Sequence, residues 1–198
     1  MFEPETKDPF ALFATWFADA EASESKDPNA MTVATASSAG RPSARILLLK
    51  EVDERGFVFY TNFESRKGTE LTVNPFAALC FHWKMSARQV RVEGPTLRVS
   101  DADADEYFRS RARLSQIGAW ASQQSRPLAS RNSLMTMVTK YEVDYADQEI
   151  PRPPYWTGTR VVPLHIEFWQ DGDFRLHDRF VFSRAHENEA WTITRLSP

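Results

Sequence analysis

The first pattern along the chain is that of an amphipathic helix. Its apolar residues are Phe10, Leu12, Phe13, Trp16, Phe17 and Ala20, and charged residues fall between and after them. Apolar positions three and four residues apart return to one face of a helix. The pattern predicts a helix over residues 9–24, within an N-terminal helix region of residues 1–26, that packs one face on the core.

From residue 31 the pattern becomes that of short strands. The segments TVATA, SARILLLK, GFVFYT, FAALCFHW and RQVRVEGPTLRV are rich in β-branched and aromatic residues, and turn sequences such as SSAGRPS and DERG separate them. Near the C-terminus, HIEFWQ, FRLHDRFVFSR and AWTITRL return to the same alternation. Strands joined by tight turns favour an antiparallel barrel or sandwich over a parallel α/β sheet. We expect about five strands first, and three more that rejoin them.

Helical signals interrupt and follow these strands. The segment SRKGTELTVN at 65–74 predicts a short helix with Ser65 as N-cap. Ser100 is placed to cap a second helix, a third helical stretch lies near 113–122, and PRPPYW at 151–156 reads as extended. The sequence contains no internal repeat or linker, so we expect a single domain over 1–198. Its fold should be mainly β with flanking helices (α+β), and strands within 150–198 should complete it.

Composition limits the classes of function. The 24 basic and 27 acidic residues give a net charge of −3, which offers no global electrostatic footprint for nucleic acid or an anionic membrane. Any anion site must be local. The single cysteine, Cys80, cannot form an intramolecular disulfide, and no Cys/His pattern has zinc spacing. No window reaches the roughly 18 apolar residues of a membrane span, and the N-terminus lacks signal-peptide character. We expect a cytoplasmic protein without a metal.

The sequence YTNFESRKG is a candidate phosphate site. A predicted strand ends at Tyr60 and Thr61, after which Ser65, Arg66 and Lys67 open a helix. Backbone N–H groups, the positive end of the helix dipole and two cationic side chains converge there, as a phosphate monoester requires. The alternative is a surface helix with basic residues in its first turn, where the dipole disfavours them.

Two further clusters are candidates. Tyr107, Arg111 and Ser115 are spaced four residues apart, so they share one face if a helix runs unbroken through them. That face is either a second phosphate cradle or a solvated surface with Tyr107 half buried. Arg175 and His177 belong to FRLHDRF, in which alternate positions face the same side of a strand together with Arg179. That side is either solvent or a polar cleft for an anionic or electron-rich ligand.

The predicted strand RILLLK carries Arg45 and Lys50 at its ends, and a regular strand places them on opposite faces. They are either ligand-binding groups or the solvated ends of a core strand. The sequence holds no nucleophile elbow, P-loop or G-x-G-x-x-G fingerprint. Nucleotide binding through those loops is therefore not expected.

Taken together, the motifs resemble the pyridoxamine 5'-phosphate oxidase family, whose members are FMN-containing homodimers with a split β-barrel fold. The resemblance rests on DPNAM, RILLLK, GFVFYTNFESRKG, RQVRVEG, YFRSR, SQIGAWASQQS, IEFWQ, RLHDRF and the ending TRLSP, in the family's order and spacing. It covers nearly the whole of residues 27–198 and is therefore far more specific than any single motif.

The resemblance assigns roles by position. It implies that FMN is contacted by Arg45, Ile46, Leu47, Leu48, Leu49, Lys50, Tyr60, Thr61, Arg66, Lys67, Gln89, Gln124, Ser125, Trp169 and Arg179. Arg66, Lys67 and Ser125 would hold the FMN phosphate. Lys50, Tyr107, Arg111 and Ser115 would bind the substrate phosphate, while Arg175 and His177 would lie over the reacting carbon as catalytic residues.

The implied activity is oxidation of pyridoxamine and pyridoxine 5'-phosphates to pyridoxal 5'-phosphate with O2, which yields H2O2, and ammonia from the amine. It would serve vitamin B6 biosynthesis and salvage, in a homodimer with FMN at the subunit interface. Two alternatives remain open, namely another split-barrel FMN reductase and a non-enzymatic FMN or pyridoxal phosphate binder. Departures from the family pattern are the lack of its N-terminal substrate-covering segment, Trp156–Thr159 in place of its WGG motif, and Met85–Ala87 before RQV.

Overall fold

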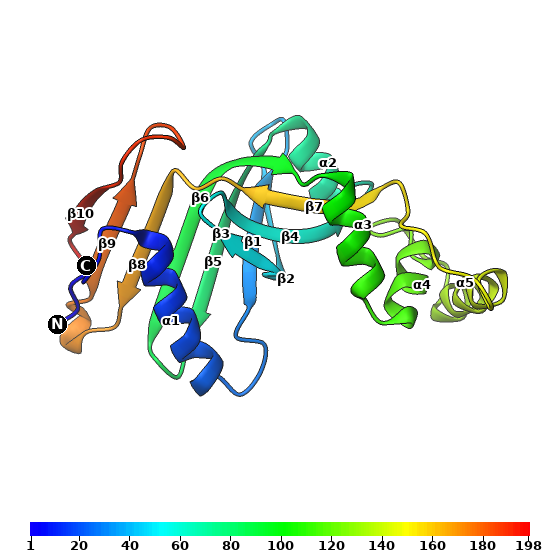
Figure 1. Cartoon of the computed structure of the whole chain (residues 1–198), viewed down its shortest axis with the longest axis horizontal. Coiled ribbons are helices and arrows are strands. Elements are labelled where there is room, and N and C mark those ends of the chain that lie inside the picture. Colours follow the sequence, from blue (N-terminus) through cyan, green and yellow to red (C-terminus); the bar gives the residue numbers. More distant parts are fainter.

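The computed structural model describes residues 1–198 and is organised around one large antiparallel sheet. Its path runs β10-β9-β8-β6-β5-β1-β2, and β7, β4 and β3 branch from β6 (Figure 1). The strands are β1 (Ala30–Ala36), β2 (Pro42–Leu48), β3 (Glu51–Asp53), β4 (Gly56–Asn62), β5 (Phe76–Trp83), β6 (Arg88–Arg98), β7 (Trp156–Val161), β8 (His165–Gln170), β9 (Asp178–Ser183) and β10 (Thr192–Leu196). The predicted mainly antiparallel fold is confirmed.

The branch in the sheet lies within β6. Its first half pairs with β8, and its last residues, from Thr96, pair with β7. At Gly94 between the two halves, an added Cβ would lie 1.9 Å from the Val162 carbonyl oxygen. Only glycine permits this close approach of the two backbones, so β6 passes from one partner strand to the other at that point.

Helix α1 (Pro9–Ser23) covers the main core, as its apolar periodicity predicts. Asp8 caps it, accepting a hydrogen bond from the Phe10 amide. Phe13 and Trp16 are buried in a cluster with Phe57, Phe81 and other residues of the sheet. In Figure 1 this helix crosses the sheet beside β8, and both chain termini lie next to β9 and β10.

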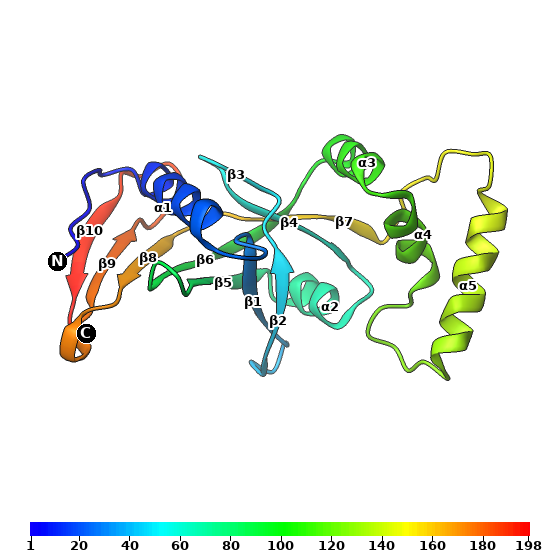
Figure 2. The ribbon, with the colours of Figure 1, turned by 90° about the horizontal axis from the view of Figure 1, so that it is seen from below.

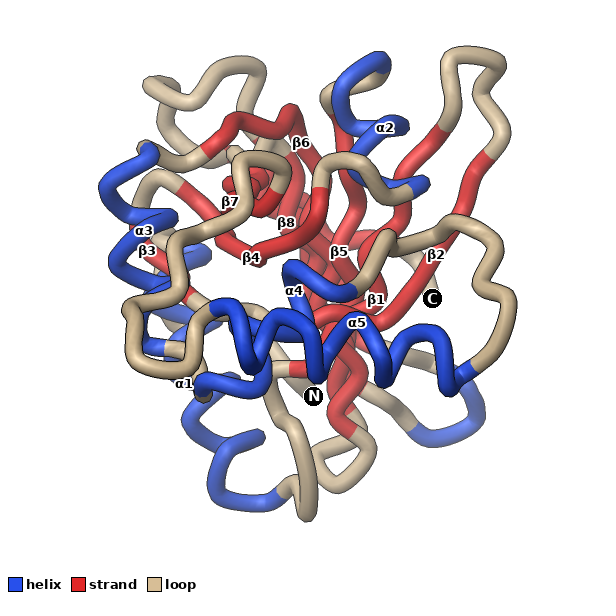
Figure 3. The backbone as a smooth tube through the Cα atoms, turned by 90° about the vertical axis from the view of Figure 1, so that its right-hand side faces the viewer, coloured by secondary structure: helices blue, strands red, loops and turns tan.

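The remaining helices are α2 (Arg66–Val73), α3 (Asp101–Ser110), α4 (Arg113–Ala121) and α5 (Arg131–Asp144). Figures 2 and 3 show that α3, α4 and α5 gather at the end of the molecule away from β10. Three helices therefore follow β6, and the expectation of two was wrong. None of the helices is long and apolar enough to cross a membrane.

The two helical stretches expected after Ser100 and near 113–122 are α3 and α4, and Arg111, with ψ 148°, separates them, so the condition of one unbroken helix is not met. Other expectations need correction. The strand expected over FRLHDRF begins only at Asp178. Phe174 and Arg175 instead have φ of 56° and 66° within a short 3-10 turn, so Arg175, His177 and Arg179 do not share a strand face. Strands β3 and β7 were not predicted.

Candidate active site

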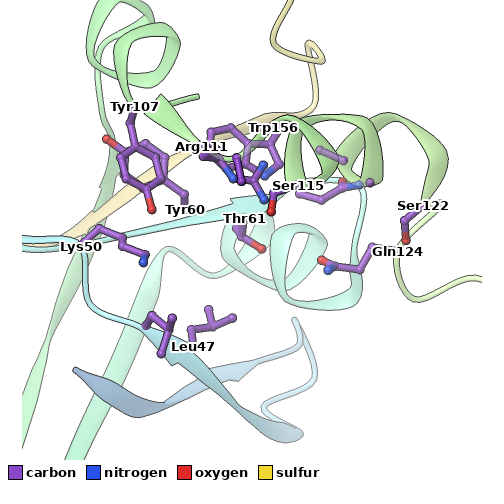
Figure 4. A pocket seen from close by; sticks show the side chains of 15 residues that line it. Leu47, Lys50, Tyr60, Thr61, Tyr107, Arg111, Ser115, Ser122, Gln124 and Trp156 are labelled. Carbon is purple, nitrogen blue, oxygen red and sulfur yellow. The ribbon is translucent and has the colours of Figure 1, made fainter. Parts of the chain in front are cut away.

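A cavity of about 640 Å³ opens where the end of β2, β4, β7, α3 and α4 meet, within the size range of small-molecule sites. Figure 4 shows side chains from these elements pointing into it. The lining residues are Leu47, Leu48, Lys50, Tyr60, Thr61, Asn62, Tyr107, Arg111, Ala112, Ser115, Gly118, Ala119, Ser122, Gln124 and Trp156. This set contains two cations and no carboxylate, so the cavity suits an anion.

One wall of the cavity is a cluster of three aromatic rings with nearly parallel planes. The ring centre of Tyr60 lies 4.0 Å from that of Tyr107 and 5.2 Å from that of Trp156, and the latter two are 6.1 Å apart. Burial of Tyr60, with a smaller contribution from Glu51, raises its pKa to about 12. Its hydroxyl therefore stays protonated at neutral pH and remains a hydrogen-bond donor.

Arg111 is the most informative side chain in the cavity. Its guanidinium lies 4.7 Å from the centre of the Trp156 ring, and its Nη1 is buried without a hydrogen-bond partner. Burial lowers the pKa of Arg111, although a guanidinium remains charged. A buried donor without an acceptor is costly, so an anion bound in the cavity would satisfy it.

Helix α4 contributes its N-terminus beside Arg111. The residue before it, Ala112, provides no side-chain cap, and Ser115 lies in its first turn. Free amide groups at a helix N-terminus favour an anion. Lys50 follows the end of β2, with its Nζ 5.9 Å from the centre of the Tyr107 ring. Tyr107, Arg111 and Ser115 thus enter one cavity from two consecutive helices and the residue between them, instead of from one face of an unbroken helix.

Lys67, on helix α2, is a further cation at the border of the cavity. Ser65 caps this helix as predicted, accepting a hydrogen bond from the Gly68 amide. The ammonium of Lys67 is 2.8 Å from Oε1 of Gln124, a lining residue, and 3.1 Å from the Ser65 hydroxyl. Burial of Lys67 and repulsion from Arg45 lower its pKa to about 8. The first turn of α2, which carries Lys67, packs closely against the backbone of Phe63. An added Cβ on Gly68 would lie only 2.3 Å from that backbone.

Arg66 and Arg45 converge on a carboxylate beneath this site. Arg66 Nε lies 2.9 Å from Glu70 Oε1, and Arg45 Nη2 lies 3.7 Å from Glu70 Oε2. Burial alone would raise the pKa of Glu70, but hydrogen bonds from Ser43, Thr35 and Arg66 outweigh it and lower that pKa to about 2. The Arg45 side chain therefore faces this network instead of the cavity.

The other expected site residues are dispersed. Leu49 is buried in the core, Ile46 is exposed on β2, and Ser125, with φ 69°, lies in the loop after α4. Gln89, Trp169, Arg175, His177 and Arg179 lie on β6, β8, β9 and the turn before β9, and none lines the cavity. Figure 1 places β9 and that turn at the opposite end of the molecule from α4. Arg179 pairs there with Glu167 at 2.9 Å.

Sequence reasoning missed one feature of the cavity. Trp156 was noted only as part of an altered motif, yet it supports the Arg111 guanidinium. A proline-rich segment ending in Trp-Thr-Gly was the available signal, because proline disfavours helix and bulky aromatic and β-branched residues favour strand. The start of α4 near residue 113 was predicted, although Ala112 before it provides no capping signal. The structure holds no cluster of His, Cys, Asp or Glu side chains arranged to bind a metal ion.

Comparison with known proteins identifies the family. Residues 17–143 match the family model described as pyridoxamine 5'-phosphate oxidase, and residues 156–198 match the pyridoxine 5'-phosphate oxidase C-terminal dimerisation region. The chain belongs to the pyridoxamine 5'-phosphate oxidase family. Among curated relatives, pyridoxine/pyridoxamine 5'-phosphate oxidases of Azorhizobium caulinodans and Gluconobacter oxydans are each 59% identical over 96% of this chain, covering 90% and 94% of their own lengths.

Solved structures agree with this family. PhzG from Burkholderia lata, in complex with tetrahydrophenazine-1-carboxylic acid, is 30% identical, has a TM-score of 0.92, and is matched over 100% of this chain and 98% of its own. A pyridoxamine 5'-phosphate oxidase-related, FMN-binding protein from Nostoc punctiforme has a TM-score of 0.75 at 14% identity, covering 96% and 98% of the two chains. The predicted split-barrel fold of this family is confirmed.

Proposed function

We propose that this chain is an FMN-dependent oxidase that converts pyridoxamine and pyridoxine 5'-phosphates to pyridoxal 5'-phosphate, with O2 as electron acceptor. Relatives that carry this name share 57 to 59% of their residues with it. The observation that carries the proposal is the buried, unpartnered Nη1 of Arg111 in a cavity without carboxylates. A phosphate group supplies the acceptors that this nitrogen lacks.

The chemistry of the site fits FMN. Lys67 is 7% exposed and has no carboxylate partner, so a phosphate dianion would both pair with it and raise its pKa. Apolar side chains of Leu47 and Leu48 line the same cavity for a flavin ring. Arg66 and Ser125 would complete the phosphate contacts, with Gln124 linking that region to the cavity.

When bound, FMN would accept a hydride equivalent from the substrate and pass its electrons to O2. The chain's own residues would bind and orient the substrate. Arg111, Ser115 and the N-terminus of α4 would hold its phosphate, with Lys50 opposite and the Tyr107 hydroxyl as a further donor. Arg175 and His177 would lie over the reacting carbon, where a fixed cation stabilises developing negative charge.

The proposed site needs two copies of the chain. The cavity residues and the pair Arg175 and His177 lie in separate regions of one chain, which supports an active site shared across a homodimer interface, with FMN between the subunits. The match of residues 156–198 to a dimerisation region supports the same arrangement. In that region Phe174 is 93% exposed beside Arg175, as a residue covered by a second subunit would be.

An absorbance spectrum and a peroxide-coupled oxidase assay test the proposal. The purified or FMN-reconstituted protein should show flavin bands at about one FMN per chain, and should release H2O2 with pyridoxamine 5'-phosphate or pyridoxine 5'-phosphate. Unphosphorylated pyridoxamine is the matched control and should require a KM higher by roughly 100-fold or more, since the phosphate contacts are lost. A protein that binds FMN but turns over neither phosphate ester would refute the oxidase assignment.

A further inference from the structure

One buried side chain connects the two helices that supply the phosphate cradle. Gln116 lies near the start of α4 and is 9% exposed. Its side-chain nitrogen Nε2 donates hydrogen bonds to two backbone carbonyls, that of Arg111 at 2.9 Å and that of Arg109 at 3.1 Å. Both carbonyls lie at the C-terminal end of α3. A side chain of the second helix is therefore bonded to the backbone at the end of the first.

The break between the two helices takes the usual donor away from the Arg111 carbonyl. In an unbroken helix, this carbonyl would accept from the amide of Ser115. That amide donates at 2.8 Å to the Ala112 carbonyl instead, since Arg111 has an extended ψ of 148°. A backbone carbonyl without a donor is unfavourable where water is excluded. Gln116 supplies the donor that the break removes.

The bond to the Arg111 carbonyl also fixes the conformation of Arg111. The angle ψ of a residue sets the direction of its own carbonyl group, so holding the Arg111 oxygen holds this angle near 148°. In this conformation the Arg111 guanidinium lies 4.7 Å from the centre of the Trp156 ring, and Nη1 has no acceptor within the chain. Figure 4 shows both side chains at the cavity. Gln116 thus holds the backbone of Arg111 and leaves its side chain free to bind a ligand.

Apolar packing around Gln116 holds the helices together but does not set this angle. Phe108 and Ile117 are buried in one cluster with Ile150 and Trp156, and burial of apolar surface is non-directional. The Gln116 amide carries two N–H groups on one nitrogen, one for each of the two carbonyl oxygens. The directional contact at this break therefore comes from Gln116.

We propose that Gln116 is a positioning residue for the substrate phosphate. It holds Arg111 in the non-helical conformation that presents the guanidinium to that phosphate. Gln116 does not line the cavity itself, so it acts through Arg111. The proposal rests on the proposed function, which assigns this cavity to the phosphate of the substrate. Its consequence is that Gln116 controls affinity for the phosphate group and not the rate of flavin reduction.

Titration of the FMN-loaded protein with pyridoxal 5'-phosphate tests this without turnover, since that compound is the proposed product. Gln116→Met keeps a side chain of similar volume but lacks both N–H donors. It should weaken binding by roughly 10-fold, the lower end of the range for a hydrogen bond to a charged group. Pyridoxal, which lacks the phosphate, should bind wild type and variant equally. Gln148→Met, at an exposed position away from the cavity, is the matched control and should bind like wild type.

Two results of this titration would overturn the proposal. They are unchanged binding of pyridoxal 5'-phosphate by Gln116→Met, and an equal weakening for pyridoxal and its phosphate. Flavin content and the circular dichroism spectrum show whether the variant folds. If Gln116→Met does not fold, Gln116→Asn, whose amide stops one methylene short of the two carbonyls, takes its place with the same expected results.

The Arg111→Ala background separates positioning from general support of the cavity. If Gln116 acts through the Arg111 side chain, adding Gln116→Met to Arg111→Ala should weaken pyridoxal 5'-phosphate binding no further. A further 10-fold loss in that background would refute the positioning role. Anaerobic stopped-flow measurements give a second readout: Gln116→Met should raise the half-saturating concentration of pyridoxamine 5'-phosphate roughly 10-fold. The reduction rate at saturation should stay within about twofold of wild type, and a larger fall would contradict the proposal.

Failure of the oxidase function gives a different result. A wild-type protein that binds pyridoxal 5'-phosphate more tightly than pyridoxal, but reduces its flavin with neither phosphate ester, is not the proposed oxidase. The titration still decides the role of Gln116 in that case. A wild-type protein that binds pyridoxal and pyridoxal 5'-phosphate with equal affinity has no phosphate cradle at Arg111, and the proposal for Gln116 is then wrong.

Discussion

At the scale of single residues, the site is marked by buried cations that lack carboxylate partners. Several half-buried arginines of this chain are neutralised by acids: Arg152 pairs with Asp101 and Asp105, Arg160 with Glu51 and Asp53, and Arg179 with Glu167. Arg111 and Lys67 have no such partner. Since burying an unpaired charge is costly, these two positions carry an energetic cost that a bound phosphate would offset.

The pH dependence of FMN affinity should report on Lys67. Its pKa of about 8 in the free protein lies below the lysine reference, and a phosphate partner would raise it. Above pH 8, FMN binding must therefore take up a proton, so affinity should be constant from about pH 7 to 8 and then fall by up to 10-fold per pH unit. Fluorescence titration with FMN measures this.

Riboflavin, which carries the same ring without the phosphate, is the control ligand for this titration and should lack the fall above pH 8. The Lys67→Met variant should bind FMN more weakly by roughly 10-fold or more and should also lose the fall. An identical pH profile for wild-type protein and Lys67→Met would show that Lys67 does not face the phosphate.

Arg111 should control substrate affinity without affecting the cofactor. Arg111→Ala removes the unpaired guanidinium from the cavity and should raise the KM for pyridoxamine 5'-phosphate by roughly 10- to 100-fold, the value of a charge-assisted hydrogen bond. FMN content should stay at the wild-type level. Arg109→Ala, at an exposed position two residues earlier, is the matched control and should leave KM unchanged. Loss of FMN from Arg111→Ala would reverse the assignment of the two phosphate sites.

At the scale of elements, the sequence predicted those helices and strands whose apolar residues recur at a regular spacing. Helix α1 follows from apolar residues three and four positions apart, the strands β1, β5 and β8 follow from their β-branched and aromatic residues, and Ser65 and Ser100 cap helices as expected. Helix α5 buries no residue completely and its apolar residues form no single stripe, so periodicity did not reveal it. Asp171 and Gly172 mark a turn there, but the left-handed conformation of Phe174 was not predicted, because no glycine or asparagine occupies that position itself.

Motif spacing selected the site residues even where the boundaries of the helices could not be predicted. The sequence predicted helical stretches on both sides of Arg111, but no proline or glycine marks the break between them, so it left open whether one helix or two would supply the second cradle. The spacing argument still selected Tyr107, Arg111 and Ser115, and all three line the cavity.

Helix α2 should lose its attachment to the β1–β2 hairpin in acid. The Glu70 carboxylate accepts hydrogen bonds from Thr35 and Ser43 and pairs with Arg66. Its pKa of about 2, below the ordinary 4.5, means that ionised Glu70 stabilises the fold fully above about pH 4.5, and that this contribution disappears as the pH falls toward 2.

Urea unfolding at several pH values measures this contribution. Near neutral pH, Glu70→Gln should lower the free energy of unfolding by roughly 1.5 to 3 kcal/mol, the value of hydrogen bonds to a charged group, and the difference from wild type should narrow below pH 4.5. Glu64→Gln is the control, since Glu64 is 52% exposed in its pair with Arg126 and should change stability by less than about 1 kcal/mol. A difference that grows in acid would contradict the ionised state of Glu70.

At the scale of the whole molecule, the fold separates the two halves of the proposed site. The curled sheet places the cavity beside α3 and α4, and it places the turn with Arg175 and His177 beyond β8 (Figure 1). Two exposed apolar residues, Phe174 and Leu176, flank Arg175 in that turn. In the proposed homodimer, a second copy of the chain would cover such residues and would bring the other half of the site.

Mixed dimers test this arrangement directly. Arg111→Ala and Arg175→Ala chains should each be nearly inactive alone when assayed at low substrate concentration. If a site takes Arg111 from one chain and Arg175 from its partner, each mixed dimer contains one intact site and one doubly altered site. Random assembly from equal amounts of co-expressed chains then makes half of the dimers mixed, so activity should recover to about one quarter of the wild-type level.

The reciprocal mixture is the control. Chains that carry both substitutions, co-expressed with wild-type chains, form mixed dimers in which every site lacks either Arg111 or Arg175. A shared site therefore predicts about one quarter of wild-type activity here too, all of it from wild-type homodimers, and purified mixed dimers should be inactive. Sites contained in one chain predict the opposite on both counts: no recovery in the first mixture, and half-active mixed dimers in the second. Purifying the mixed dimers with two different affinity tags before the assay makes the two outcomes fully distinct.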